Sequence, residues 1–206
     1  GTDCAPLRAL TAPGGAGGAC RPENHEDREE SSMEKPRNVF LIGPMGAGKT
    51  TVGKILADEL GLEFLDTDKE IEDRTGADIG WIFDVEGEEG FRKREAAMLD
   101  ELTQRNGVLV ATGGGVILRE ENRKRLVSRG TVVYLDAPLE QQVERTSRDR
   151  NRPLLQDGEP REILEGMAAE RDPLYREVAD YVFRADKRSA RVLATEICKA
   201  LREGSN

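Results

Sequence analysis

The sequence predicts a three-layer α/β fold in which a parallel β-sheet carries helices on both of its faces. Short apolar runs alternate with helical patterns from residue 37 onward, and this alternation is typical of parallel sheets. A glycine-rich loop joins the first apolar run to the first helical pattern, which is the setting of a phosphate-binding loop. A length of 206 residues suffices for one such domain with a sizeable core.

Five apolar runs predict five strands, because short runs bounded by polar residues suit a buried parallel sheet. The expected strands span 39–42, 62–65, 108–111, 131–135 and 181–183. Apolar residues at helical spacing predict the helices between and after them, at 49–60, 69–74, 90–105, 120–128, 139–146, 161–178 and 189–202. Ligands of such sheets bind beyond the carboxyl ends of the strands, so the residues after each run are the candidates for function.

Residues 1–36 differ from the rest and are expected to form a disordered leader ahead of a domain at 37–206. Residues 11–20 are rich in glycine and alanine, and 21–36 are almost wholly polar, so neither part can bury enough surface to offset its ordering entropy. The leader lacks the apolar centre of a secretory signal. Met33 is an alternative start of the chain. We expect that removing the leader leaves activity intact.

The composition excludes several classes of function. A formal net charge of −9 argues against a nucleic-acid or anionic-membrane partner. No apolar stretch is long enough to cross a membrane. Cys4, Cys20 and Cys198 have no metal-ligand spacing and favour reduced thiols in a cytoplasmic protein. The only histidine is His25, in the leader, so acid–base chemistry has to use carboxylates or lysine.

The loop GPMGAGKT, residues 43–50, follows the first expected strand and matches the P-loop pattern. Its glycines allow backbone N–H groups to approach phosphate oxygens, and the next helix adds the partial positive charge of its N-terminus. Lys49 would reach the β- and γ-phosphates and Thr50 would coordinate Mg²⁺. A chance glycine-rich turn is the alternative. The motif alone does not separate GTPases, ATPases and kinases. The expected nucleotide-binding residues here are Gly46, Ala47, Gly48, Lys49, Thr50 and Thr51.

Two aspartates, Asp66 and Asp68, follow the second expected strand. One carboxylate could serve Mg²⁺ directly or through water, and the other could accept a proton from a substrate hydroxyl or orient it. The alternative for Asp68 is helix capping. The third strand ends in Gly113, Gly114 and Gly115 instead of an aspartate, so Asp66 is the candidate metal carboxylate. The glycines offer bare N–H groups to a ligand, or else form a flexible turn.

Arginines supply the positive charge that an anionic ligand needs. Arg92 begins a helical pattern with Glu95 one turn later, and could form a bidentate pair with a substrate carboxylate. A surface salt bridge is the alternative. Another arginine, Arg171, follows in the C-terminal part of the chain.

A second group of arginines lies in an irregular segment at about 145–160. Four arginines fall within eight residues there: Arg145, Arg148, Arg150 and Arg152. A solvated charge run is the usual explanation of such a group. A mobile lid that closes over ATP and brings positive charge to the transferring phosphoryl group is the alternative that we favour.

These motifs together resemble the shikimate kinase family over about residues 37–203. The shared motifs are GPMGAGKT, DTD, RTGADIGWIFDVEGEEGFRKRE, ATGGG, RPLL and ERDPLY, in the order and spacing of the family. The resemblance implies a P-loop kinase fold of the nucleoside-monophosphate-kinase type, with a five-stranded parallel sheet, a mobile lid and a small substrate-binding region. It also implies transfer of the γ-phosphoryl group of ATP to the 3-hydroxyl of shikimate, in aromatic amino-acid biosynthesis.

The resemblance assigns roles to individual residues. Lys49 and the P-loop backbone hold the phosphates, while Thr50 and Asp66 serve Mg²⁺. Asp68 binds the reacting hydroxyl and is the candidate base. The substrate is further bound by Arg92, Arg171, Gly114 and Gly115, the two arginines gripping its carboxylate. Arg152 is the lid arginine that approaches the phosphates, and Arg145 packs against adenine.

Two other functions stay open at this point. One is another small-molecule kinase of the same fold, such as a gluconate or nucleotide kinase. A nucleotide kinase would need a pocket for a second base, whereas the paired Arg92 and Arg171 favour a compact acid. The other is a non-catalytic nucleotide-binding module, which would bind ATP without turnover. We expect a cytoplasmic monomer that acts on ATP and shikimate and has no nucleic-acid or membrane partner.

Overall fold

The computed structural model describes residues 37–147, 159–186 and 188–204. The expected leader, and most of the expected lid with Arg148, Arg150 and Arg152, lie outside the described residues. Their assignments therefore stay predictions. Among the described residues, no helix combines the length and the apolar character that crossing a bilayer requires.

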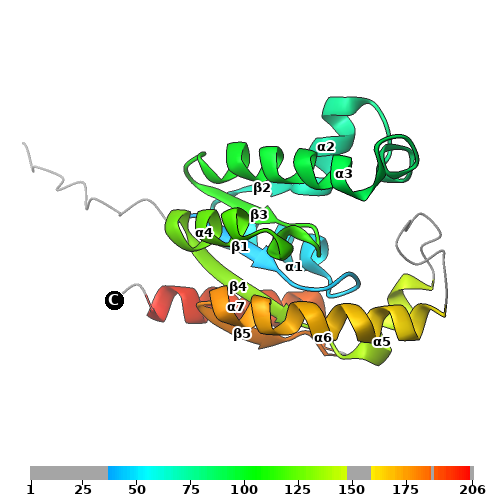
Figure 1. Ribbon diagram of the computed structural model, residues 1–206. Coiled ribbons are helices and arrows are strands. Elements are labelled where there is room, and N and C mark those ends of the chain that lie inside the picture. Colours follow the sequence, from blue (N-terminus) through cyan, green and yellow to red (C-terminus); the bar gives the residue numbers. More distant parts are fainter. Residues whose placement is uncertain (1–36, 148–158, 187, 205–206) are drawn as a thin grey trace, which may run out of the picture. The chain divides into compact units, whose positions relative to one another are not determined.

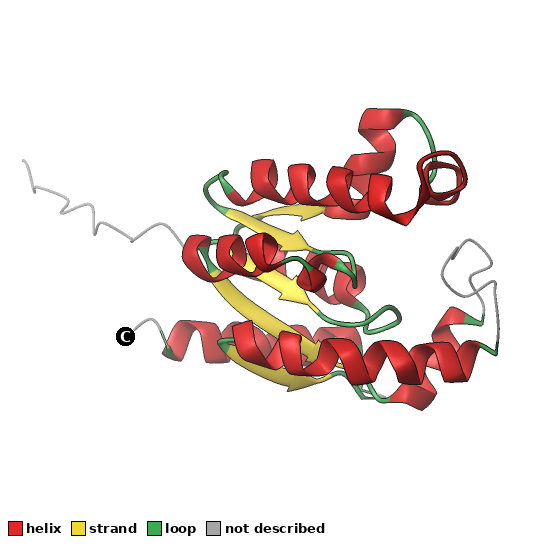
Figure 2. Cartoon of the chain, in the orientation of Figure 1, coloured by secondary structure: helices red, strands yellow, loops and turns green. Residues whose placement is uncertain are grey.

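Five parallel strands form one sheet, as the sequence predicts, in the order β2-β3-β1-β4-β5. Figure 2 shows the strands as a layer between helices. Their bounds are Val39–Ile42 for β1, Glu63–Asp66 for β2, Val108–Ala111 for β3, Thr131–Asp136 for β4 and Tyr181–Arg184 for β5. Because β3 lies between β1 and β2, the loops that follow these three strands begin next to one another, at the carboxyl edge of the sheet.

Helices cover both faces of the sheet (Figure 1). Alternate residues of each strand point to opposite faces, so Phe40 and Ile42 pack with α3, α4 and α6, while Val39 and Leu41 pack with α1 and α7. Each cluster is a continuous apolar core. The helices span Lys49–Leu60 for α1, Thr67–Thr75 for α2, Ile79–Thr103 for α3, Glu120–Arg129 for α4, Leu139–Thr146 for α5, Pro160–Val178 for α6 and Ala190–Glu203 for α7, with a 3₁₀ turn, η1, at Val116–Leu118.

The α3 segment is the main departure from the expected elements. The sequence predicts a helix from residue 90, whereas helical structure already begins at Ile79. Gly87 interrupts it with a backbone φ of 68° and ψ of 178°, so α3 consists of two helical pieces joined by a kink. The side chain of Asp78 caps the first piece by accepting a hydrogen bond from the Trp81 N–H.

Candidate active site

The loops after β1, β2 and β3 enclose a cavity of about 340 Å³ at the carboxyl edge of the sheet. The phosphate-binding loop forms one wall, and Asp66, Asp68 and the first glycines after β3 form another. Arg145, Asp186 and Arg188 complete it from α5 and from the segment between β5 and α7. The strand order thus brings together three motifs that are far apart in the sequence.

The phosphate-binding loop leads into the N-terminus of α1. Gly46 and Gly48 have backbone φ angles of 77° and 88°, in the left-handed region that glycine tolerates without strain. Gly48 is the N-cap of α1 and no side chain caps the helix, so the N–H groups of its first turn can bind an anion. Nζ of Lys49 donates hydrogen bonds to the carbonyls of Gly43 and Pro44, at 2.7 and 2.8 Å. Its ammonium group therefore lies against the loop.

The Thr50 hydroxyl donates a hydrogen bond of 2.7 Å to Oδ2 of Asp66. The other carboxylate oxygen of Asp66 accepts from the backbone N–H groups of Asp68 and Lys69 and caps α2. The capping alternative for Asp68 is therefore wrong, because Asp66 is the cap and Asp68 lies within the first turn of α2. Thr50 and Asp66 offer hard oxygen ligands of the type that Mg²⁺ binds. In the part of the chain that the structure describes, no three His, Cys, Asp or Glu side chains form a metal-binding group.

Asp68 lies against the glycine loop after β3. A Cβ atom on Gly113 would come within 2.9 Å of Oδ1 of Asp68 and within 2.6 Å of Oε1 of Glu95. Only glycine leaves room for the two carboxylates at this point. The Gly113 N–H donates a hydrogen bond of 3.0 Å to the Thr67 hydroxyl, which ties the loop to the start of α2. The three glycines are thus a packed element rather than a flexible turn.

Arg92 is 6% exposed and lies next to Glu95, which is 1% exposed. Nη1 of Arg92 donates a hydrogen bond of 2.8 Å to Glu95, and Nη2 donates one of 3.1 Å to Glu88. A surface salt bridge is therefore the wrong interpretation of Arg92. A charge buried at this position is costly unless it is paired, and the pair keeps the guanidinium group in place.

Arg171, on α6, is also 6% exposed, and its Nε has no hydrogen-bond partner among the described residues. Burial raises the pKa of Glu95, and the positive charges of Arg92, Arg171 and Arg119 oppose this rise, so positive charge gathers around this carboxylate. A buried guanidinium N–H without a partner disfavours the folded state unless a ligand supplies an acceptor. Arg92 and Arg171 together therefore form a suitable site for an anionic group.

Gly115 lies directly against Arg92. A Cβ atom there would overlap the guanidinium group, although the backbone angles of Gly115, φ −93° and ψ −3°, are accessible to alanine. We expect Gly115→Ala to displace Arg92 and to raise the KM for the acceptor by about 10- to 100-fold, because overpacking of a closed site costs about 1–3 kcal/mol.

The matched control is Gly166→Ala, on α6. A Cβ atom on Gly166 meets no atom within 4 Å, so this variant should keep the wild-type KM and gain about 0.5–1 kcal/mol in helix stability. Steady-state kinetics of the two variants checks the prediction. Equal acceptor KM values would contradict the contact between Gly115 and Arg92.

Burial raises the pKa of Glu95 above its ordinary value of 4.5, and the guanidinium group of Arg92 opposes the rise. A carboxyl group with a raised pKa holds its proton more tightly in the folded state. Its contribution to stability therefore falls as the pH rises above 4.5 through the folded-state pKa. Glu95→Gln removes this titration. We expect the Tm of the variant minus that of wild type to increase as the pH rises above 4.5 in thermal denaturation. A difference independent of pH would show that Glu95 does not titrate in this way.

Arg145 lies at the site, on the last turn of α5. Nη1 of Arg145 donates a hydrogen bond of 2.8 Å to the Gly46 carbonyl, on the phosphate-loop side of the site. Arg152 lies outside the described residues. Two residues were missed by the sequence analysis, Arg188 at the cavity and Tyr175 behind Gly114. Arg188 follows the fifth strand, where the rule about strand ends could have found it, and Tyr175 lies in the ERDPLY motif.

A family model described as shikimate kinase matches residues 45–202 of the chain. A shikimate kinase of Vibrio campbellii is 60% identical over 171 residues, which are 83% of this chain and 99% of the relative. A shikimate kinase of Photobacterium profundum is 58% identical over 172 residues, covering 84% of this chain and 98% of the relative.

Solved structures agree with these relatives. A shikimate kinase from Acinetobacter baumannii in complex with shikimate has a TM-score of 0.81 at 53% identity, covering 83% of this chain and 96% of that chain. A shikimate kinase from Aquifex aeolicus has a TM-score of 0.72 at 34% identity, covering 82% of this chain and 98% of that chain. A gluconokinase from Sinorhizobium meliloti, at 16% identity over 84% of this chain and 99% of that chain, with a TM-score of 0.50, shares the fold alone.

Proposed function

The chain belongs to the shikimate kinase family, and from this premise we propose how its residues transfer the γ-phosphoryl group of ATP to the 3-hydroxyl of shikimate. The products are shikimate 3-phosphate and ADP, and the reaction belongs to aromatic amino-acid biosynthesis. One observation carries the residue assignment. The phosphate-binding loop, Asp68 and Gly114 line one cavity, and the buried Arg92 lies against the next residue, Gly115, with Arg171 acting on the same carboxylate, Glu95. This set matches an acid that carries hydroxyl groups.

The nucleotide binds on the phosphate-loop side of the site. Backbone N–H groups of residues 46–51 and the ammonium group of Lys49 bind the phosphates. Lys49 exchanges its carbonyl partners for phosphate oxygens, which are stronger acceptors. Arg145 packs beside the adenine, and Arg152 brings positive charge to the transferring group.

The acceptor binds between α2, the glycine loop and α6. Arg92 and Arg171 bind its carboxylate, and Gly114 and Gly115 bind it through their backbone. Asp68 orients the reacting hydroxyl and accepts its proton as the bond to phosphorus forms. Phosphoryl transfer depends mainly on positioning and on charge stabilisation, so no histidine is required.

Mg²⁺ is the metal that this site would hold. Thr50 would bind it directly and Asp66 through water, and both fit because their oxygens already lie within hydrogen-bond distance of each other. A bound Mg²⁺ neutralises charge that develops on the phosphates. Few protein ligands are needed, since Mg²⁺ keeps several waters and takes further oxygens from the substrate phosphates.

We propose that the enzyme acts in the cytoplasm. Cys198 is a free and buried thiol, which agrees with a reducing cytoplasm. The acidic composition supports a protein without nucleic-acid or membrane partners, and we propose that it acts as a monomer. The family model matches residues 45–202, which leaves 1–36 outside the match, so a form without residues 1–36 should keep its kcat/KM.

The experiment that tests the function is ADP release with Mg·ATP, measured with shikimate, quinate, gluconate or no acceptor. We expect fast release only with shikimate. Quinate and gluconate also carry a carboxylate and hydroxyl groups, so they test the fit of the acceptor site rather than its charge. Release without preference among the acceptors would contradict the substrate assignment, and ATP binding without release would contradict the catalytic roles.

A further inference from the structure

Tyr175, on α6, connects the glycine loop to the helix that carries Arg171. It is 2% exposed, and its hydroxyl donates a hydrogen bond to the carbonyl of Gly114. A Cβ atom on Gly114 would lie 3.7 Å from this hydroxyl, 3.4 Å from the Met45 nitrogen and 3.5 Å from the Gly43 carbonyl oxygen. Gly114 is therefore held between the phosphate-binding loop on one side and Tyr175 on the other.

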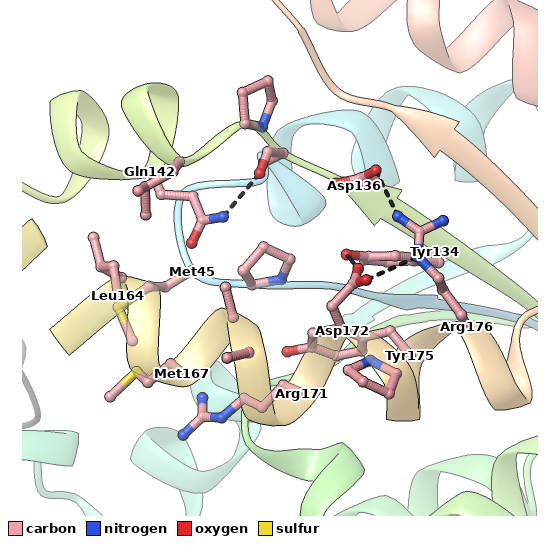
Figure 3. Close-up of a pocket in the computed structure, with 17 residues that line it drawn as sticks. Met45, Tyr134, Asp136, Gln142, Leu164, Met167, Arg171, Asp172, Tyr175 and Arg176 are labelled. Carbon is pink, nitrogen blue, oxygen red and sulfur yellow. Dashed lines mark hydrogen bonds and ion pairs between the residues drawn. The ribbon is translucent and has the colours of Figure 1, made fainter. Parts of the chain in front are cut away.

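The ring of Tyr175 is itself held from behind. Tyr134, on β4, stacks on it with ring centroids 4.9 Å apart, and the Tyr134 hydroxyl donates a hydrogen bond of 2.7 Å to Asp172. Arg176 pairs with Asp172 and with Asp136 at the end of β4. Figure 3 shows these side chains beside a cavity of about 460 Å³ between the phosphate loop, the end of β4, α5 and α6. The ring of Tyr134, and not its hydroxyl, is the part that contacts Tyr175.

Arg171 and Tyr175 are four residues apart on α6 and share a face of the helix. Tyr175 contacts the loop that presents Gly114 and Gly115, while Arg171 has its unpartnered Nε one turn earlier. Burial raises the pKa of the Tyr175 hydroxyl, so it stays protonated and acts as a donor at any working pH. This hydrogen bond therefore links the loop that carries Gly114 and Gly115 to the helix that carries Arg171.

We propose that Tyr175 is a positioning residue that sets the spacing between the glycine loop and Arg171, and so determines the affinity for the acceptor. This inference rests on the acceptor site proposed above. The nucleotide side should depend on Tyr175 less than the acceptor side does, because the phosphate loop has its own contacts through Lys49 and Arg145. Tyr175 acts through other residues, so its loss should change acceptor binding more than the chemical step.

The test compares Tyr175→Phe with Tyr134→Phe. Each variant keeps its aromatic ring and loses one buried phenol hydrogen bond, so a merely structural effect would be similar in both. We expect Tyr175→Phe to raise the KM for shikimate by about tenfold, which is the effect of one well-placed hydrogen bond, while the KM for ATP and kcat change less than about threefold. Tyr134→Phe should leave all three values close to wild type.

Shikimate affinity measured calorimetrically without ATP should follow the same pattern as the KM. Equal shikimate affinities in the two variants, or a parallel loss of ATP affinity in Tyr175→Phe, would overturn the inference. Wild-type enzyme is measured alongside. If wild type shows no shikimate-dependent ADP release, the proposed function fails. If wild type is active and both variants match it, only the role of Tyr175 fails.

Discussion

Asp68→Asn is expected to lower kcat by about 10²- to 10⁴-fold, the usual contribution of a positioned general base, while the affinity for ATP stays within about twofold. Asparagine keeps the shape of the side chain but accepts no proton. Asp68 does not cap α2, since Asp66 does, so the substitution leaves the helix start intact. Steady-state turnover together with calorimetric titration of ATP checks both parts of the prediction.

The control for Asp68→Asn is Asp73→Asn on the same helix. Asp73 is exposed and pairs only with Lys69, at 2.7 Å, in the described structure. Surface pairs of this kind contribute about 0–1 kcal/mol, so the control variant should have wild-type kinetics and nearly wild-type stability. A kcat for Asp68→Asn within about threefold of wild type would remove Asp68 from the proton transfer.

Arg92→Met is expected to raise the KM for shikimate by at least about 100-fold, because truncating a buried charge that pairs with a ligand costs about 2–5 kcal/mol. The KM for ATP should not change, since Arg92 lies away from the phosphate loop and pairs with Glu95 and Glu88. The substitution also leaves Glu95 buried without its main partner. We therefore expect a loss of about 3–5 kcal/mol in stability, measured by denaturant unfolding.

Two further variants separate binding from stability. The double variant Arg92→Met/Glu95→Gln removes the uncompensated charge and should recover much of the stability while the shikimate KM stays high. Arg94→Met removes an arginine two residues away whose partner is Glu86 at the surface, and should behave as wild type. If the double variant also recovered the KM, Arg92 would act through folding and not through the substrate.

The α3 segment shows where prediction from local pattern stops. Gly80, Gly87 and Gly90 interrupt the apolar spacing between residues 79 and 90, and glycine disfavours a helix. The structure nevertheless forms two helical pieces there, because Ile82 and Phe91 pack into the core on either side of the kink at Gly87. The burial of these two side chains thus outweighed the low helix propensity of the segment.

The sequence by itself determined the features that depend on neighbours along the chain. The P-loop pattern predicted a glycine-rich loop between β1 and α1, and the five apolar runs predicted the five strands, with bounds that differ by at most one residue. The position of Asp66 and Asp68 at the carboxyl end of β2 also followed from the local sequence. These features require only that residues a few positions apart have the right chemistry.

Only the tertiary structure decided which of these features meet. The order β2-β3-β1-β4-β5 places the loops after β1, β2 and β3 at one edge, and no local pattern encodes strand order. Burial of Arg92 and Glu95 ruled out the alternative of a surface salt bridge, and packing brought Tyr175 to Gly114, 61 residues away. Contacts over such separations depend on how the helices pack on the sheet, which is a property of the whole core.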